Sequence, residues 1–241
     1  MPAPELLARL ASAPGRAAIV LDVDGTLAPI VPRPELATVP DATRDQLARL
    51  VARYALVACL SGRPGGKAAA LVGVQGIRYV GNHGLELHPD HGRLAAEIAA
   101  FRDRVSGLWP VEDKVLSLSF HYREAVDEDA ARTDLEAIAG QAEAAGLVAR
   151  WGRKVLEIRP RVAADKGTAI VAIVQDAGVA AALYAGDDRT DLDAFRGLRE
   201  AGLSLAVCVA VDSVEAPPEL LEAADLVVDG PAGIVELLGR L

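Results

Sequence analysis

The sequence predicts an α/β protein, with a Rossmann-like parallel-sheet core and a smaller α/β cap domain inserted into it. Short apolar segments rich in branched residues, such as 17–21, alternate with amphipathic segments of helical period. This alternation is typical of a parallel sheet that helices cover on both faces. By contrast, residues 115–122 alternate between apolar and polar side chains, which predicts a strand with one exposed face. That change of pattern indicates a second, smaller unit within the core.

The core is expected to comprise residues 1–93 and 162–241. In its first part the pattern predicts helices over 4–12, 42–53 and 64–73, and strands over 17–21, 55–60 and 77–80. Asp41 is the expected N-cap of the second helix. The four prolines in 28–40 predict an irregular segment there. The second part is expected to contain helices over 167–177 and 191–200, strands over 182–185, 203–211 and 225–228, and a terminal helix after Pro231.

The inserted domain is expected to comprise residues 94–161, which form an open-faced module. Its predicted helices cover 93–108 and 127–145, and its predicted strands cover 115–122, 147–151 and 155–159. Together these elements predict a β-α-β-β block whose sheet has one solvent-exposed face.

Composition excludes several classes of function. The chain has 241 residues, of which 51% are hydrophobic, and a net charge of −9. An acidic chain without a stripe of basic residues is a poor candidate for binding nucleic acid or an anionic membrane. The N-terminal segment has no apolar core of signal-peptide length, and no apolar segment reaches the length of a membrane span, so we expect a cytoplasmic protein. We also expect it to be a monomer. Cys59 and Cys208 lie in apolar segments and match no disulfide or zinc pattern.

The segment Asp22-Val-Asp-Gly-Thr directly follows the first apolar strand. If the chain stays extended, Asp22 and Asp24 lie on the same side of it, and Gly25 allows a sharp turn. Two like charges at the end of a buried strand need an opposite charge, and carboxylates suit Mg²⁺. A solvated turn is the alternative. A calcium loop of the EF-hand type is excluded, because Leu27 stands where that loop requires glycine.

Polar residues also follow two other predicted strands, with Ser61 and Gly62 after one and Asp187 and Asp188 after another. The carboxyl ends of parallel strands meet at one edge of a sheet. These groups are therefore expected to meet there, together with Lys166 at a helix start. Taken singly, Ser61 could begin a turn and Lys166 could be a solvated helix-end residue.

The combined set suits phosphoryl transfer through an aspartyl phosphate. Asp22 would be the nucleophile and Asp24 the general acid and base. Asp22, Asp187 and the backbone carbonyl of Asp24 would hold Mg²⁺, with Asp188 supporting the metal. Ser61, Gly62 and Lys166 would bind the phosphate.

Four motifs in order carry a resemblance to a known superfamily. Asp22-x-Asp-Gly-Thr, Ser61-Gly-Arg, Lys166 and Gly186-Asp-Asp-Arg-Thr-Asp resemble the motifs of haloacid-dehalogenase-like phosphatases. The predicted insertion corresponds to that superfamily's α/β cap. Within the superfamily, Gly81-Asn-His-Gly and Lys154-Val-Leu-Glu-Ile-Arg-Pro are similar to trehalose-6-phosphate phosphatases. Leu192 stands where such families often have glutamate.

The resemblance implies a sugar-phosphate substrate and assigns contacts with it to Arg63, His83, Arg123, Lys154 and Glu157. Lys154 and Glu157 are three residues apart, so strict strand alternation would put them on opposite faces. A bulge or twist is therefore required. The alternative for these two residues is ion pairing, and for His83 it is a structural role.

Several functions remain open at this point. One is a phosphatase for a sucrose phosphate, mannosyl-phosphoglycerate or an amino-sugar phosphate. Another is a phosphomutase, and a third is a non-catalytic sugar-phosphate sensor.

Overall fold

The computed structural model describes residues 3–31, 33–152, 154–213 and 216–241. The described chain divides into two compact units. Unit 1 comprises residues 1–84 and 164–241, and unit 2 comprises residues 85–163. No described helix combines the length and the apolar character that a membrane crossing requires.

Unit 1 contains a six-stranded sheet in the order β10-β9-β8-β1-β2-β3, and every neighbouring pair in it is parallel. The strands are β1 (Ala17–Leu21), β2 (Leu56–Leu60), β3 (Arg78–Val80), β8 (Ala181–Gly186), β9 (Leu205–Asp212) and β10 (Leu226–Asp229). All five residues of β1 are buried, as expected for a central strand covered on both faces.

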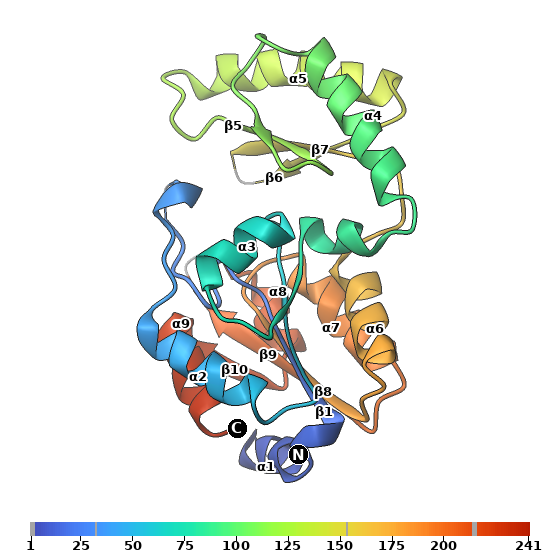
Figure 1. Cartoon of the computed structure of the whole chain (residues 1–241). Helices are drawn as coiled ribbons and strands as arrows, with labels where there is room; N and C mark the ends of the chain where they lie inside the picture. Colours follow the sequence, from blue (N-terminus) through green and yellow to red (C-terminus); the bar gives the residue numbers. More distant parts are fainter. Residues whose placement is uncertain (1–2, 32, 153, 214–215) are drawn as a thin grey trace. The chain divides into compact units, whose positions relative to one another are not determined.

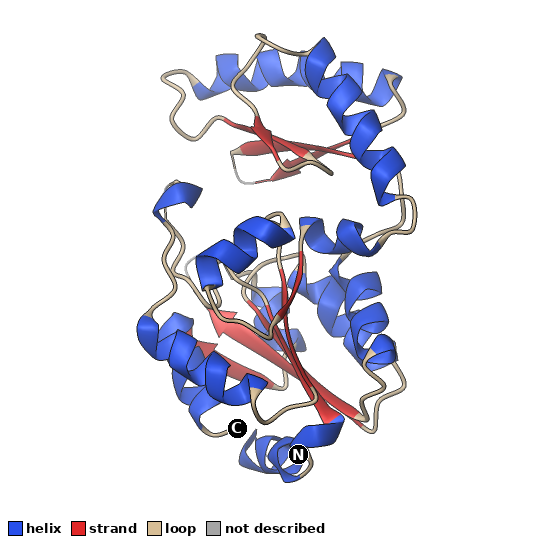
Figure 2. Ribbon diagram, viewed as in Figure 1, coloured by secondary structure: helices blue, strands red, loops and turns tan. Residues whose placement is uncertain are grey.

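Helices cover both faces of this sheet (Figures 1 and 2). On one face, Ile19 and Leu21 belong to an apolar cluster with side chains of α1 (Ala3–Ser12), α2 (Asp41–Val51), α3 (Gly65–Val72) and α9 (Gly230–Gly239). The other face is covered by α6 (Lys166–Asp176), α7 (Asp191–Glu200) and α8 (Pro218–Ala223). The period of two along β1 therefore sends alternate residues into two separate apolar layers.

Unit 2 is a four-stranded antiparallel sheet in the order β4-β5-β7-β6, covered by two helices. Its elements are β4 (Glu112–Asp113), β5 (Leu118–His121), β6 (Val148–Gly152), β7 (Val155–Arg159), α4 (His91–Arg104) and α5 (Glu128–Ala144). Side chains of β5 and β7 pack with both helices in a separate apolar cluster that includes Phe101, Phe120 and Leu135. The predicted fold class, a parallel core with a smaller α/β unit, is confirmed.

Four local details differ from the sequence-based expectations. The first boundary lies at 84/85 instead of 93/94, because α4 begins at His91 and a boundary at 93/94 would cut through that helix. The second lies at 163/164 instead of 161/162. Asp41 is the first residue of α2, and Pro40, in extended conformation, holds the N-cap position. The strand expected over 115–122 begins only at Leu118, because Val115 adopts a left-handed conformation with φ of 70°.

Candidate active site

The site is built on three neighbouring strands that end at the same level. Leu21 of β1 lies opposite Cys59 of β2 and Ala185 of β8. The backbone N–H of Asp22 donates to the carbonyl of Ala185 at 2.9 Å, so the loop after β1 leaves the sheet directly beside β8. Residues that follow these strands are therefore brought to one edge, as the motif spacing predicted.

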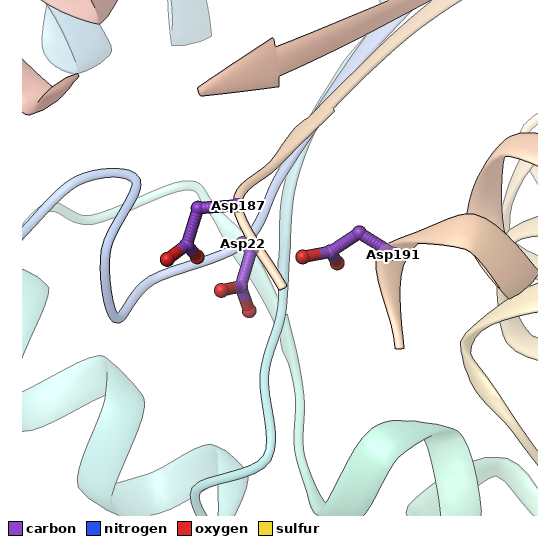
Figure 3. A group of neighbouring side chains, drawn as sticks. All are labelled: Asp22, Asp187 and Asp191. Atoms are coloured by element: carbon purple, nitrogen blue, oxygen red, sulfur yellow. The ribbon is translucent and has the colours of Figure 1, made fainter. Parts of the chain in front are cut away.

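Three buried carboxylates meet at this edge. Oxygen atoms of Asp22, Asp187 and Asp191 all lie within 4.8 Å of one another, and Figure 3 shows the three side chains turned toward a common space. Asp22 and Asp187 come from the loops after β1 and β8, and Asp191 is the first residue of α7. Their exposed fractions are only 5%, 2% and 0%, so water can screen little of their mutual repulsion.

Lys166 lies between two of these carboxylates. Its Nζ donates to Asp22 Oδ1 at 2.9 Å and to Asp191 Oδ1 at 2.7 Å. The side chain is 1% exposed. The phenol of Tyr184, buried in β8, donates to the same Asp191 oxygen at 2.6 Å. Asp191 thus holds Lys166 in the position from which it contacts Asp22.

Close packing of two helices places Lys166 beside Asp191. These residues are the first of α6 and of α7. A Cβ atom on Gly197 of α7 would lie 2.3 Å from the carbonyl oxygen of Gly167 in α6, which is far below a van der Waals contact. Only glycine at position 197 allows the two helices to approach so closely.

The pKa values indicate that the cluster lacks positive charge. Burial raises the pKa of Asp22 well above its ordinary value, against the attraction of Lys166. Burial, with neighbouring Asp191, raises the pKa of Asp187 to about 8. Burial also raises the pKa of Asp191 to about 6, although Lys166 opposes it. Burial lowers the pKa of Lys166, but the attraction of Asp191 and Asp22 outweighs this effect, so the pKa is raised. One ammonium group therefore does not balance three buried carboxylates.

A divalent cation fits this arrangement. Asp187 Oδ1 is buried and accepts no hydrogen bond from any described residue, a costly state unless another donor or a cation is bound. Gly25, with φ of 80°, makes room for that carboxylate, since a Cβ atom there would lie 1.9 Å from Asp187 Oδ2. Carboxylate oxygens are ligands that Mg²⁺ prefers. Asp22 and Asp187 could hold the ion, with Asp191 close beside them.

Asp188 has a different role from its neighbour Asp187. Its Oδ1 accepts from the backbone N–H of Thr190 at 2.7 Å and from the Thr190 hydroxyl at 2.6 Å. Its own N–H donates to Asp191 Oδ2 at 2.9 Å. Burial acts upward on the pKa of Asp188, but Lys166 and the Thr190 bonds outweigh it and lower the pKa to about 2. Asp188 therefore shapes the loop that carries Asp187 and Asp191.

The loop after β2 is tied to the loop after β3. The N–H of His83 donates to the carbonyl of Ser61 at 2.9 Å, and the N–H of Asn82 donates to that of Arg63 at 3.0 Å. The His83 ring lies directly over Gly62, where a Cβ atom would meet it at 2.8 Å. Ser61 Oγ accepts from the N–H of Arg63 at 3.1 Å, which leaves the hydroxyl hydrogen for another acceptor. Ser61, Gly62 and His83 therefore form one rigid corner at this edge.

The carboxylate of Asp24 is paired with Arg63. Two nitrogens of the guanidinium donate to the two carboxylate oxygens, Nε to Oδ2 at 2.7 Å and Nη2 to Oδ1 at 2.6 Å. The Asp24 carboxylate is therefore not one of the three that cluster beside Lys166.

The remaining predicted residues, Arg123, Lys154 and Glu157, belong to unit 2. Arg123 is exposed in the segment after β5. Lys154 precedes β7 in a left-handed conformation with φ of 59° and pairs with Glu128 of α5. Strand alternation does not apply to a residue outside the strand, which resolves the expected conflict between Lys154 and Glu157. Glu157 accepts from the Ser117 hydroxyl at 3.1 Å.

Asp191 and Tyr184 were missed as site residues in the sequence-based reasoning. The sequence places Asp191 at the end of the Gly186–Asp191 motif and at the start of a predicted helix, and Tyr184 within a predicted apolar strand, without a role for either side chain. A signal existed for Asp191, because it lies one helical turn beyond Asp187 at the start of a predicted helix. The contact between Tyr184 and Asp191 has no local sequence signal.

Comparison with known proteins identifies the family. The sequence model of the trehalose-phosphatase family matches residues 20–106 and 103–223. The chain belongs to the trehalose-phosphatase family. It is 36% identical over 215 residues to an uncharacterized glycosyl hydrolase of Mycobacterium tuberculosis, covering 80% of this chain but 16% of that protein. It is 31% identical to a Zea mays trehalose 6-phosphate phosphatase, covering 96% of this chain and 72% of that protein. The chain thus spans only a small part of the mycobacterial relative.

Several solved structures share the fold of this chain. The Candida albicans trehalose-6-phosphate phosphatase C-terminal domain superposes with a TM-score of 0.69 at 22% identity, over 99% of this chain and 96% of that one. A haloacid dehalogenase-like hydrolase from Bacteroides thetaiotaomicron superposes with a TM-score of 0.60 at 16% identity, over 93% and 98%. The C-terminal domain of the Candida albicans trehalose synthase regulatory protein also has the fold (TM-score 0.65, 15% identity, 98% and 97% covered).

Proposed function

We propose that this protein is a Mg²⁺-dependent phosphatase that hydrolyses trehalose 6-phosphate to trehalose and phosphate through an aspartyl phosphate on Asp22. One observation carries the proposal. In a member of the trehalose-phosphatase family, Asp22 lies buried beside Lys166 and within a cluster of carboxylates that lacks positive charge. A non-catalytic domain would have no need to keep that costly arrangement.

In the first half of the reaction an oxygen of Asp22 attacks phosphorus and the bond to the sugar oxygen breaks. Lys166 bonds Asp22 Oδ1, which orients the carboxylate and leaves Oδ2 for attack. Bound Mg²⁺, held by Asp22, Asp187 and the backbone carbonyl of Asp24, would reduce the repulsion between the nucleophile and the anionic phosphate. Asp24 gives its proton to the leaving oxygen. Ser61 donates to a phosphoryl oxygen.

In the second half a water molecule attacks the phosphorus of the aspartyl phosphate. Asp24, now a carboxylate, takes a proton from that water, and the bond between Asp22 and phosphorus breaks. Inorganic phosphate leaves and Asp22 returns to its starting state. The same proton donor and acceptor thus serves both halves.

The mechanism is tested by phosphate release from trehalose 6-phosphate with Mg²⁺ and with EDTA. We expect release with Mg²⁺ only, and none from Asp22→Asn, which keeps the shape but loses the attacking charge. A matched control is Asp176→Asn, because Asp176 forms a surface ion pair with Arg78 in the same unit. Wild-type rates from Asp22→Asn would refute the assigned nucleophile.

Choice of substrate is assigned to residues outside the phosphoryl site, because that site meets only phosphate, metal and the first oxygen. We propose that Arg123, Lys154 and Glu157 contact the sugar, with His83 supporting the site. Glu157→Ala should lower kcat/KM for trehalose 6-phosphate by roughly 10- to 100-fold, equivalent to ~1.5–3 kcal/mol for a hydrogen bond to a charged group. An aryl phosphate, which lacks the sugar, should be hydrolysed almost as before. Equal losses on both substrates would contradict this role.

A panel of sugar phosphates separates the remaining candidates. Faster turnover of a sucrose phosphate, mannosyl-phosphoglycerate or an amino-sugar phosphate would reassign the substrate. Transfer of labelled phosphate to a second sugar would indicate a phosphomutase. Tight binding of trehalose 6-phosphate without release of phosphate would indicate a sensor.

A further inference from the structure

Arg63 connects two loops of the candidate active site through a bidentate ion pair. Its Nε and Nη2 atoms donate to Asp24 Oδ2 and Oδ1 at 2.7 and 2.6 Å. Paired N–H bonds in one plane fix the orientation of a carboxylate as well as its place. Arg63 lies after β2 and Asp24 after β1, so the pair joins the ends of neighbouring strands.

The backbone that carries Arg63 is held on both sides. Its carbonyl accepts from the N–H of Asn82 at 3.0 Å, and its N–H donates to Ser61 Oγ at 3.1 Å. The Arg63 side chain is only 17% exposed. Arg63 is therefore a fixed donor, because its loop cannot move without breaking these bonds.

The Asp24 side chain, by contrast, depends on this contact for its orientation. Its backbone lies in a tight turn, in which the N–H of Gly25 donates to the carbonyl of Ala28 at 2.8 Å. The Asp24 side chain is 43% exposed, and without the contact with Arg63 its side-chain bonds could rotate. Each oxygen that accepts from Arg63 keeps a second lone pair for a proton.

We propose that Arg63 is a positioning residue that holds the Asp24 carboxylate in the orientation needed for both proton transfers, in place of the sugar contact that the family resemblance implies for it. This inference rests on the proposed function, in which Asp24 first protonates the leaving oxygen and then accepts a proton from water. General acid and base catalysis requires the proton donor within hydrogen-bond reach of the reacting atom. Arg63 does not touch the substrate in this assignment.

The test compares Arg63→Lys, which keeps the charge but loses the planar pair of donors, and Arg63→Gln with wild-type enzyme. Arg44→Lys is the matched control, because Arg44 donates to the carbonyls of Leu71 and Val72 elsewhere in unit 1. Steady-state rates are measured with trehalose 6-phosphate and 4-nitrophenyl phosphate, and bound phosphate is trapped by rapid acid quench. Circular dichroism confirms that each variant is folded.

A positioning role predicts that kcat for trehalose 6-phosphate falls roughly 10- to 100-fold in both Arg63 variants, with KM for that substrate within about 2-fold, as expected when a proton-transfer group is misplaced. Nitrophenolate leaves without a proton, so its release should show a burst of one equivalent in the variants while trapped phosphate accumulates on the protein. The Arg44 control should match wild type.

Other outcomes overturn the inference. A raised KM for trehalose 6-phosphate with unchanged kcat would show that Arg63 binds substrate. Wild-type kinetics in both variants would show that the pair is dispensable. If wild-type enzyme itself releases no phosphate, the proposed function fails first, and the inference about Arg63 fails with it.

Discussion

Tyr184→Phe isolates one hydrogen bond in the middle of the candidate site. The change removes a hydroxyl and leaves the ring, which packs edge-on against Phe195 with centroids 6.2 Å apart. Tyr184 is fully buried, so no water replaces the lost donor and no large cavity forms. The hydroxyl donates to Asp191 Oδ1 at 2.6 Å, and Asp191 in turn holds Lys166.

The magnitude follows from the charge on the acceptor. A hydrogen bond to a charged group contributes about 1.5–3 kcal/mol. Because Lys166 continues to donate to the same oxygen, we expect the lower part of that range. A loss of about 1.5–2 kcal/mol lowers the melting temperature of a domain of this size by roughly 3–8 °C. With Lys166 less firmly held, kcat should fall several-fold, while KM should change little.

The control is Tyr79→Phe in the same unit, whose hydroxyl donates to the neutral backbone carbonyl of Val74 at 2.9 Å. A neutral bond contributes about 0.5–1.5 kcal/mol, so this variant should lose less stability and no activity. Both tryptophans, Trp109 and Trp151, belong to unit 2, so unfolding of unit 1 is better followed by circular dichroism or calorimetry than by tryptophan fluorescence. Equal losses in the two variants, or an unchanged kcat in Tyr184→Phe, would refute this reasoning.

Three further predictions concern the carboxylate cluster. Gly25→Ala would place a methyl group 1.9 Å from Asp187 Oδ2 and should abolish Mg²⁺ binding in titration calorimetry; unchanged binding would exclude Asp187 as a ligand. The pKa of Asp187 is raised from 3.8 to about 8, so ionisation is disfavoured in the folded state. Metal-free protein should therefore lose stability as pH rises from about 4 to about 8, and Mg²⁺ should raise the melting temperature more at pH 8 than at pH 5. A flat profile without metal would contradict this. Lys166→Met leaves the buried carboxylates of Asp22 and Asp191 without their cationic partner and should cost about 3–5 kcal/mol in urea unfolding, whereas a loss below about 1 kcal/mol would show that Lys166 is not needed to balance them.

Local patterns in the sequence predict the fold class, the placing of most strands and helices, and the residues at the strand ends. These predictions depend on local features, each of which spans only a few residues of the chain. They are the spacing of apolar residues, the glycine after Asp24 and the carboxylates directly after β1 and β8. Because parallel strands end at one edge of a sheet, the meeting of Asp22 with Asp187 followed from topology alone.

The pairing of side chains in the site depends instead on how the whole chain packs. Lys166 and Asp22 are 144 residues apart, and Arg63 and Asp24 are 39 residues apart. Such pairs depend on how helices and loops pack, as in the approach of α6 and α7 at Gly197, and no local periodicity encodes that packing. For the same reason the sequence does not predict that Asp191, the first residue of α7, holds Lys166. Arg63, which family resemblance assigned to the sugar, was found bonded to Asp24.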